Sequence, residues 1–350
     1  MIVIDGSYGE GGGQVLRSAL TLATLLGQPV RIERIRAGRP NPGLAAQHLT
    51  GVLAMASVCS AKLNGAELGS QELTFVPRYS GQAGTYSFDV AEARRGGSAG
   101  STSLVFQPLL LPLAAASGSS RVTITGGTHV AWSPPYHYLE YVYLPTMARL
   151  GVRASIQIKR WGWFPIGGGT ITATVEGSGR LALAPLDLTQ RGQLIRIHGI
   201  SALSNLPKHI GQRQKQRMGE VLRARGFTPE ITIVHAPAKG QGTAVFLVAE
   251  YEQAVAGFTA LGARGKPAEK VAEEACRYFL AYHESGAALD MHLADQLVLP
   301  LALARGESAF TTCRITRHLL TNIWVVEHFL PVKFTIGGEE GQAGLVTVCP

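Results

Sequence analysis

The stretch QPLLLPLAAASGSSRVTIT, residues 107–125, occurs again in altered form as QLVLPLALARGESAFTTCRIT, residues 296–316. When Pro112 is aligned with Pro300, leucines flank both prolines and Gly118 falls on Gly306. Each copy is typical of an apolar helix, a glycine that ends it and an alternating strand. A looser third copy spans residues 11–38. The repetition predicts a pseudo-symmetric architecture built from helix-then-strand units.

The sequence pattern changes between the second and third copies. Residues 183–282 combine strand patterns with two helical ones, and they hold 13 Lys and Arg against 8 Asp and Glu, so 13 − 8 = +5 of the total charge of +8 lies there. One helix is predicted from Pro267 to a stop at Gly286. We therefore predict an inserted small α/β domain at 183–282, and a large domain made of residues 1–182 and 283–350.

Composition limits the class of protein. A chain of 350 residues with 46% hydrophobic content can bury a large core, and its longest apolar stretch, residues 104–116, is interrupted by two prolines. No membrane span or signal peptide is visible. Four cysteines without CxxC spacing favour thiols in a reducing compartment over disulfides or a zinc site. The cytoplasm is the expected location.

The positive charge suggests an anionic partner. Residues 208–225 carry six basic side chains and one acid, Glu220. This segment either lies along a nucleic-acid backbone or forms a solvated helix face, and charge alone favours neither.

The N-terminal stretch DGSYGEGGGQVLRSA, residues 5–19, leads from a strand into a helix. Its glycines let backbone N–H groups approach an anion at a helix N-terminus, although it matches neither a P-loop nor a dinucleotide fingerprint. Glu10 beside such a site calls for a divalent cation, and the alternative is a tight turn with an exposed Glu. A second Gly/Ser loop, residues 94–103, precedes a helix of the repeat in the same way.

Other polar residues gather at turns and helix starts. Arg36 and Arg39 lie on a Pro/Gly turn before Gln47 and His48, and two such arginines either bind phosphate oxygens or keep the surface soluble. Asp295 and Gln296 open an apolar run, where an Asp commonly serves as a helix cap. Of the ten histidines, His318 is the candidate of interest, and most others fit structural roles.

Taken together, these stretches resemble the RNA 3'-terminal phosphate cyclase family. DGSYGEGGGQVLRSAL, IRAGRPNPGLAAQHLT, SAGSTSLVFQ, FPIGGGT, LADQLVLPLALA and HLLTNIWVVEHFLPV fall in family order over nearly the whole chain. The resemblance implies an α/β fold of three units, each a four-stranded sheet with two helices. The implied fold is similar to that of the C-terminal domain of bacterial initiation factor 3 and of enolpyruvyl-shikimate-phosphate synthase. The resemblance also implies a smaller inserted α/β domain.

The resemblance also implies roles for residues. His318 stands at the position that attacks the α-phosphate of ATP. The positions implied to line the nucleotide and metal site are Glu10, Arg17, Arg36, Gln47, His48, Gln107, Asp295 and Gln296. We add Arg39 to the phosphate-binding set, and His292 stands where relatives often have Tyr. Glu10 and Asp295 are expected to hold Mg²⁺ or Mn²⁺.

The implied reaction is an ATP-dependent ligase-type conversion. An RNA 3'-terminal phosphate becomes a 2',3'-cyclic phosphate through a histidinyl-AMP and an adenylylated RNA end. Two alternatives are a non-catalytic RNA-binding relative that acts in ribosome assembly and an enolpyruvyl-transferase-like enzyme; His318 with its flanking LLTN argues against both. The oligomeric state, the preferred metal and the residues that hold the RNA stay open.

Overall fold

The structure, a computed structural model, describes residues 1–93 and 98–350. Across the described residues the strands form four sheets of four strands each. Three of these sheets share one topology. In each, the first two strands in sequence pair in parallel, the fourth pairs antiparallel with the second, and the third pairs antiparallel with the fourth at the edge. The predicted fold class of three repeated units with an inserted α/β part is confirmed.

The first two units are continuous in sequence. The first comprises β1 (Ile2–Asp5), α1 (Gly13–Leu26), β2 (Val30–Glu33), α2 (Ala46–Cys59), β3 (Lys62–Asn64) and β4 (Leu73–Val76). The second comprises β5 (Thr85–Asp89), α3 (Thr102–Ala115), β6 (Ser117–Gly126), α4 (Tyr136–Tyr138), the π-helical turn η1 (Leu139–Tyr143), α5 (Leu144–Arg149), β7 (Arg153–Arg160) and β8 (Gly169–Ser178). Their sheets have the equivalent orders β1-β2-β4-β3 and β5-β6-β8-β7.

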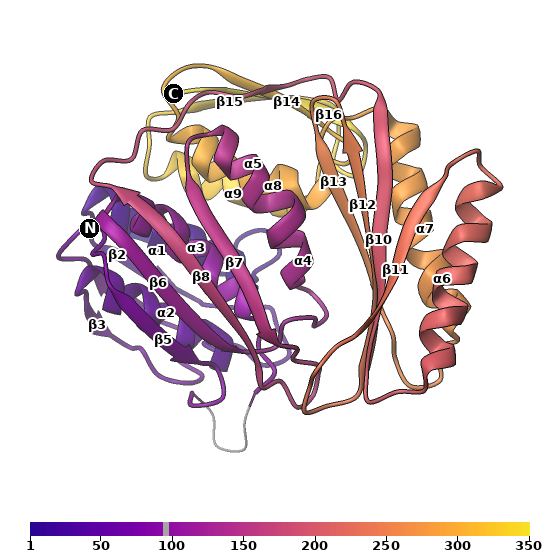
Figure 1. The fold of residues 1–350 in the computed structure, drawn as a ribbon. Coiled ribbons are helices and arrows are strands. Elements are labelled where there is room, and N and C mark those ends of the chain that lie inside the picture. The colour runs from indigo at the N-terminus through magenta and orange to yellow at the C-terminus, as the bar shows by residue number, and fades with distance from the viewer. Residues whose placement is uncertain (94–97) are drawn as a thin grey trace.

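The third unit is interrupted after its first strand. It comprises β9 (Asp187–Leu188), α8 (Met291–Ala302), β14 (Ser308–Thr312), α9 (Arg317–Glu327), β15 (Lys333–Gly337) and β16 (Gly344–Cys349). The chain between β9 and α8 holds β10 (Leu194–Ser204), α6 (Lys208–Arg223), β11 (Pro229–His235), β12 (Gly242–Tyr251), β13 (Val255–Leu261) and α7 (Ala268–Ser285). Figure 1 shows these strands on the right, with α6 and α7 on their outer face.

The inserted part has its own hydrophobic core, built from β10 to β13 with α6 and α7, and the three repeated units share a second, larger core. Residues 183–188 stay with the third unit, because Leu183 bridges to Ala304 and β9 pairs with β14. The domain limits given from the sequence remain a prediction, and we propose β10 to α7 as the inserted part.

Helices of the three units pack together between the sheets. Helix α1 packs against α2, α3 and α9, and α8 packs against α9. Pro112 inside α3 cannot donate a hydrogen bond to the carbonyl of Pro108, and the hydroxyl of Thr21 on α1 lies 3.2 Å from that oxygen. This packing brings the starts of several helices to one place.

No helix within residues 1–93 and 98–350 is both long and apolar enough to cross a bilayer. All four cysteines lie in the described residues and are free thiols.

Candidate active site

The glycine loop before α1 is shaped for close approach by its neighbours. Gly9 and Gly11 have φ angles of 64° and 54°, in the region where side chains are disfavoured. A Cβ on Gly9 would lie 2.1 Å from Thr321 Oγ1 of α9, and one on Gly13 would lie 2.3 Å from His48 Nε2 of α2. The absence of side chains therefore lets the start of α1 meet α2 and α9.

His318 lies in the first turn of α9, facing this loop. Thr316 caps the helix by accepting a hydrogen bond from Leu319 N at 3.0 Å, which fixes the backbone around His318. The Nε2 atom of His318 lies 3.0 Å from Glu10 Oε2, whereas its buried Nδ1 has no hydrogen-bond partner within the described residues. The structure thus brings two of the candidates named from the sequence, Glu10 and His318, into direct contact.

Burial lowers the pKa of His318 below its usual value, and the nearby carboxylate of Glu10 opposes that shift. Arg17 and Arg39 lower the same pKa, since a second positive charge is unfavourable beside them. Imidazole is therefore chiefly neutral at pH 7, which is the form that can act as a nucleophile.

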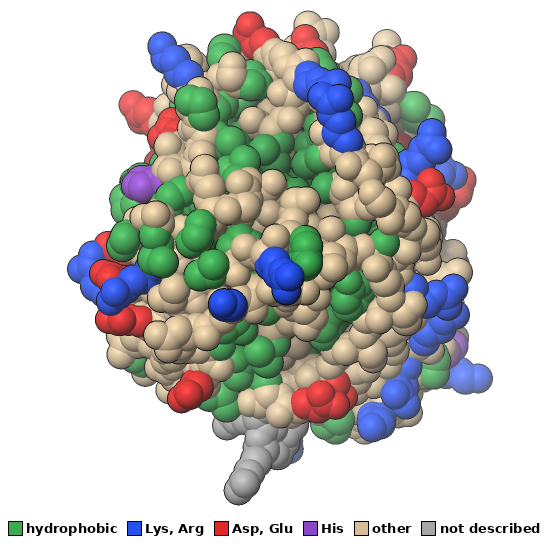
Figure 2. Space-filling view, turned by 90° about the vertical axis from the view of Figure 1, so that its left-hand side faces the viewer, with side chains coloured by type: hydrophobic (Ala, Val, Ile, Leu, Met, Phe, Trp, Pro, Cys, Tyr) green, Lys and Arg blue, Asp and Glu red, His purple; other side chains and the backbone are tan. Residues whose placement is uncertain are grey.

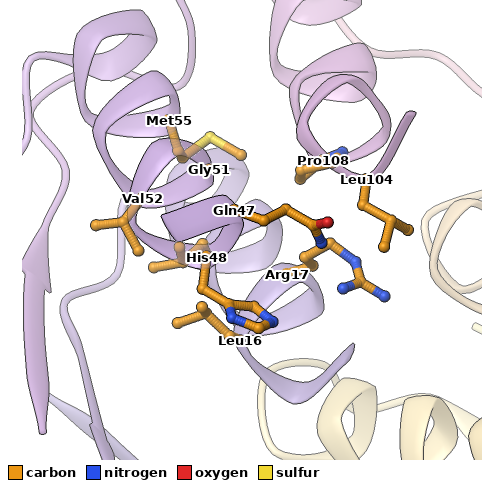
Figure 3. A pocket seen from close by; sticks show the side chains of 10 residues that line it. Leu16, Arg17, Gln47, His48, Gly51, Val52, Met55, Leu104 and Pro108 are labelled. Atoms are coloured by element: carbon orange, nitrogen blue, oxygen red, sulfur yellow. The ribbon is translucent and has the colours of Figure 1, made fainter. Parts of the chain in front are cut away.

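Arg17, Gln47 and His48 point into one narrow space between α1, α2 and α3, as Figure 3 shows. His48 Nδ1 accepts a hydrogen bond from Ala45 N at 3.3 Å, so the ring proton of neutral His48 is on Nε2, beside Gly13. Burial, reinforced by Arg36 and Arg17, lowers the pKa of His48 to about 3. His48 thus stays a neutral donor at the start of α1.

The arginines stay charged around the glycine loop. Burial lowers the pKa of Arg17 to about 10, while Asp295 opposes the shift. Arg39 lies 3.8 Å from Glu10, and Arg36 donates to the carbonyl of Gly43 at 2.7 Å. The cations Arg17 and Arg39 and the N-terminus of α1 therefore lie around the loop at which Glu10 and His318 meet.

Asp295 lies one turn into α8, and Asp290 rather than Asp295 caps that helix. Asp290 accepts hydrogen bonds from His292 N at 2.9 Å and Leu293 N at 3.1 Å. Burial, together with Asp290 and Glu10, raises the pKa of Asp295 well above its usual value, against the effect of Arg17. The alternative that Asp295 is only a helix cap is therefore wrong.

A cleft of about 490 Å³, which includes space open to solvent, lies beside Arg17 and Asp295. Gln107 Nε2 donates to Gln296 Oε1 at 2.8 Å on its wall, joining the second and third units. Asn322, which sequence reasoning missed, accepts from Gln14 Nε2 at 2.8 Å and from Ser18 Oγ at 2.7 Å. It donates to the backbone oxygen of Asp295 at 2.7 Å. Its position four residues after His318, on the same helix face, is the signal that could have revealed it.

Two further predicted features border this cluster: after burial and Arg17, His292 also lowers the pKa of His318, and the second Gly/Ser loop ends against Gln47. His292 is exposed and meets the ring of Tyr138 edge-on at a centroid distance of 6.5 Å. Of the second Gly/Ser loop, residues 94–97 lie outside the described residues, and Ser101 at its end donates its backbone N–H to Gln47 Oε1 at 2.7 Å.

The basic segment at 208–225 forms α6 and the turn after it, and three of its arginines are paired with acids of α7. Arg213 contacts Glu269 at 2.6 Å, Arg217 contacts Glu273 at 2.8 Å, and Arg225 contacts Glu284 at 3.3 Å. On the opposite side of the molecule, which Figure 2 shows, positive and negative side chains are likewise interspersed.

The donor set fits a hard cation bound together with phosphate. Among the described residues, no group of three or more His, Cys, Asp or Glu side chains is gathered tightly enough to hold a metal alone. Glu10 and Asp295 offer carboxylate oxygens, and they lie close enough for Glu10 to contribute to raising the pKa of Asp295. Mg²⁺ and similar ions are commonly held in this way, by one or two carboxylates plus substrate phosphates and water.

Known proteins resemble this chain over nearly its whole length. A family model described as RNA 3'-terminal phosphate cyclase matches residues 8–336. A protein of that name from Methylococcus capsulatus is 52% identical over 99% of this chain and 96% of its own length, and one from Nostoc punctiforme is 49% identical over 94% of both chains. The solved structure of the enolpyruvyl transferase NikO from Streptomyces tendae matches with a TM-score of 0.36 and 11% identity, covering 99% of this chain and 47% of that one.

Proposed function

Because the chain belongs to the RNA 3'-terminal phosphate cyclase family, we propose that it uses ATP to convert an RNA 3'-terminal phosphate to a 2',3'-cyclic phosphate, with His318 as the nucleophile. The observation that carries the proposal is the contact between His318 Nε2 and Glu10 at the glycine loop. It puts a neutral imidazole beside a site suited to phosphate. The free thiols are consistent with a reducing compartment such as the cytoplasm.

In the first step, a lone pair of His318 attacks the α-phosphorus of ATP, the bond to the β-phosphate oxygen breaks, and pyrophosphate leaves. Nε2 is the atom that reacts, because Nδ1 is buried. The contact with Glu10 must then open, and Nδ1 carries the proton. In this proposal Arg17, Arg39 and the N–H of His48 Nε2, which gather near the glycine loop, neutralise or bind phosphate oxygens.

Glu10 and Asp295 would hold Mg²⁺ or Mn²⁺, which supplies positive charge to the phosphates. Asp295 would bind it as the carboxylate, so the raised pKa of Asp295 predicts that a proton is released when the cation binds.

In the second step, an oxygen of the RNA 3'-phosphate attacks the phosphorus of histidinyl-AMP, and the P–N bond breaks. His318 is thereby restored. In the third step the vicinal 2'-hydroxyl attacks the activated 3'-phosphorus, releasing AMP and a proton. The ribose itself holds the hydroxyl close to that phosphorus, so positioning of the terminal sugar supplies much of the rate.

The first step can be tested with ATP labelled at the α-phosphate. The protein should acquire label in a bond that resists alkali and breaks in acid, as a phosphoramidate does, and His318→Ala should abolish it. His209→Ala, an exposed histidine on α6, is the matched control and should be labelled fully. Undiminished labelling of His318→Ala would contradict the assignment.

A further inference from the structure

Three loops from different parts of the chain meet beside the start of α3. A Cβ on Gly167 would lie 2.8 Å from the backbone oxygen of Ser98, and one on Gly127 would lie 2.3 Å from that of Ala99 and 2.6 Å from Val130 Cγ1. The turn 163–168 and Gly127 therefore border residues 98–99, and the bridge between His129 and Trp163 sets the loop that follows Val130 beside that turn. The next residues, Gly100 and Ser101, touch Gln47 of the candidate active site.

The inserted part supplies the third loop. A Cβ on Gly240 would lie 3.3 Å from Ile166 Cδ1, and one on Gly168 would lie 3.1 Å from Lys239 Cδ. Asn205 fixes this loop by donating to the backbone oxygens of Ala238 and Gly240, both at 3.0 Å. The loops thus form one continuous surface that crosses from the second unit to the inserted part.

This surface exposes large apolar side chains. Trp132 is 99% exposed, Phe164 76% and Ile166 55%. Trp132 also has a φ of 62°, which is uncommon for a bulky residue. By contrast Trp161 and Trp163 are buried in a small hydrophobic core of their own, so among these four rings only Trp132 and Phe164 are exposed.

The charge at these loops is positive. Arg160 and Lys239 are exposed, and neither forms an ion pair with a carboxylate in the part of the chain that the structure describes. Arg160 Nε donates to Gly168 O at 2.8 Å, which holds the guanidinium at the turn. On α6, in contrast, arginines are already neutralised by α7. Exposed aromatic rings beside free cations are the combination that binds single-stranded nucleic acid, since bases stack on the rings and phosphates meet the cations.

We infer that Trp132, Phe164, Arg160 and Lys239 form a stacking platform for the nucleotides that precede the RNA 3' end. The inference rests on the proposed function, because it takes RNA as the substrate. The 3' end reaches His318 past Ser101 and Gln47, and the upstream bases lie on the platform. Sequence-independent stacking gives the platform affinity for single strands of any base composition.

The double variant Trp132→Ala/Phe164→Ala tests the platform. Both rings are exposed, so folding should be unaffected. Affinity for an eight-nucleotide RNA with a 3'-phosphate, measured by fluorescence anisotropy, should fall by about 5- to 150-fold for each base that loses its stacking partner. Labelling from ATP should be unchanged. Tyr278→Ala, which removes an exposed ring of α7, is the matched control and should bind RNA as the original chain does.

A second variant, Lys239→Glu, tests the charges and should flatten the salt dependence of binding by ~0.7 units of slope per lost phosphate contact. Lys62→Glu on β3, another exposed lysine, should not. Addition of RNA should also quench the emission of Trp132, and the quenching should vanish in Trp132→Ala.

Equal RNA affinity in the double variant and the original chain would overturn the platform. So would sedimentation showing that the original chain dimerises through these rings while the double variant is monomeric and binds RNA equally well. Either result leaves the proposed function intact if ATP still labels His318. An original chain that neither takes label nor cyclises RNA would instead refute the proposed function itself.

Discussion

The two nitrogens of His318 meet different surroundings. Nδ1 is buried without a partner within the described residues, and Nε2 faces the carboxylate of Glu10. A buried nitrogen that lacks a hydrogen bond costs free energy. Packing that holds the ring in the orientation the reaction requires can offset that cost. Glu10 therefore influences both the orientation and the protonation of His318.

The carboxylate of Glu10 can be tested through the pKa of His318. Burial lowers this pKa and Glu10 raises it, so Glu10→Gln should lower it further. Imidazole is neutral above its pKa, and the fraction able to react should thus persist to lower pH in the variant. NMR titration of histidine-labelled protein without nucleotide measures this directly. Glu67→Gln, in an exposed loop, should leave the titration of His318 where it was. An upward shift in Glu10→Gln would contradict the contact.

At the scale of elements, α6 and α7 are joined by ion pairs rather than left as separate charged surfaces. Arg213 binds Glu269 through two hydrogen bonds of 2.6 and 2.8 Å, and Arg217 binds Glu273. Their partners raise the pKa of both arginines by hydrogen bonding first and charge second. All of these groups are partly exposed, so each pair contributes only modestly to stability.

Charge reversal separates the structural role of α6 from RNA binding. Arg213→Glu should lower the midpoint of urea unfolding slightly at low salt and less at high salt, since it places two acids together. The swap Arg213→Glu/Glu269→Arg should recover most of that loss. RNA affinity should change little in either variant. A loss of RNA affinity in the swap, with stability restored, would favour α6 as a nucleic-acid surface.

The sequence predicted the repeated units but not how the third is divided. Apolar runs ended by glycines gave α1, α3 and α8 in outline, and Pro267 and Gly286 marked the limits of α7. Strand β9 has two residues, too few for any periodicity, so its pairing with β14 could not be foreseen. The same holds for the arginines of α6, because their partners depend on how two helices more than 40 residues apart pack together.

For the candidate site, short motifs located the residues and only the fold shows which of them touch. Glu10 and His318 lie at opposite ends of the chain, and no local pattern brings them together. Gln14 gave no local signal, since a polar side chain inside a helix is usually exposed to solvent, and Asn322 had only its spacing from His318 to mark it. His292 is the opposite case, because its place in a motif marked it as a site candidate whereas its side chain is exposed to solvent.

At the scale of the whole molecule, a pair of buried histidines lies where the second unit meets the inserted part. His129 Nε2 lies 2.9 Å from His137 Nδ1, and His129 stacks on Trp161 at 4.0 Å. The ring of His137 lies 5.8 Å from that of Phe246 on β12. Burial lowers the pKa of His137 to about 3, and burial and then His137 lower the pKa of His129.

These histidines should make stability depend on pH. A histidine whose pKa is lower in the folded state is neutral in both states above about pH 6.5, so no stability is lost there. As the pH falls from 6.5 toward 3, only the unfolded chain takes up the proton, and each histidine costs about 1.4 kcal/mol per pH unit. His137→Gln should reduce the slope of unfolding free energy between pH 6 and 4 by about that amount, whereas exposed His235→Gln should not. An unchanged slope would show that His137 is protonated in the folded protein.

The complete reaction requires both the enzyme nucleophile and a hydroxyl of the substrate, and the two can be separated by changing the RNA end. An RNA with a 3'-hydroxyl offers no phosphate to activate and should be inert. A strand with a 3'-phosphate on a 2'-deoxy sugar should accept AMP from His318 and then stall, because water lacks the effective molarity of the missing 2'-hydroxyl, on the order of 10⁵ M or more for well-oriented groups. Gel analysis should show the adenylylated strand accumulating, while the matched ribose end is cyclised. If both ends were converted alike, the 2'-hydroxyl could not be the attacking group, and labelling of His318 would then report another nucleotidyl transfer.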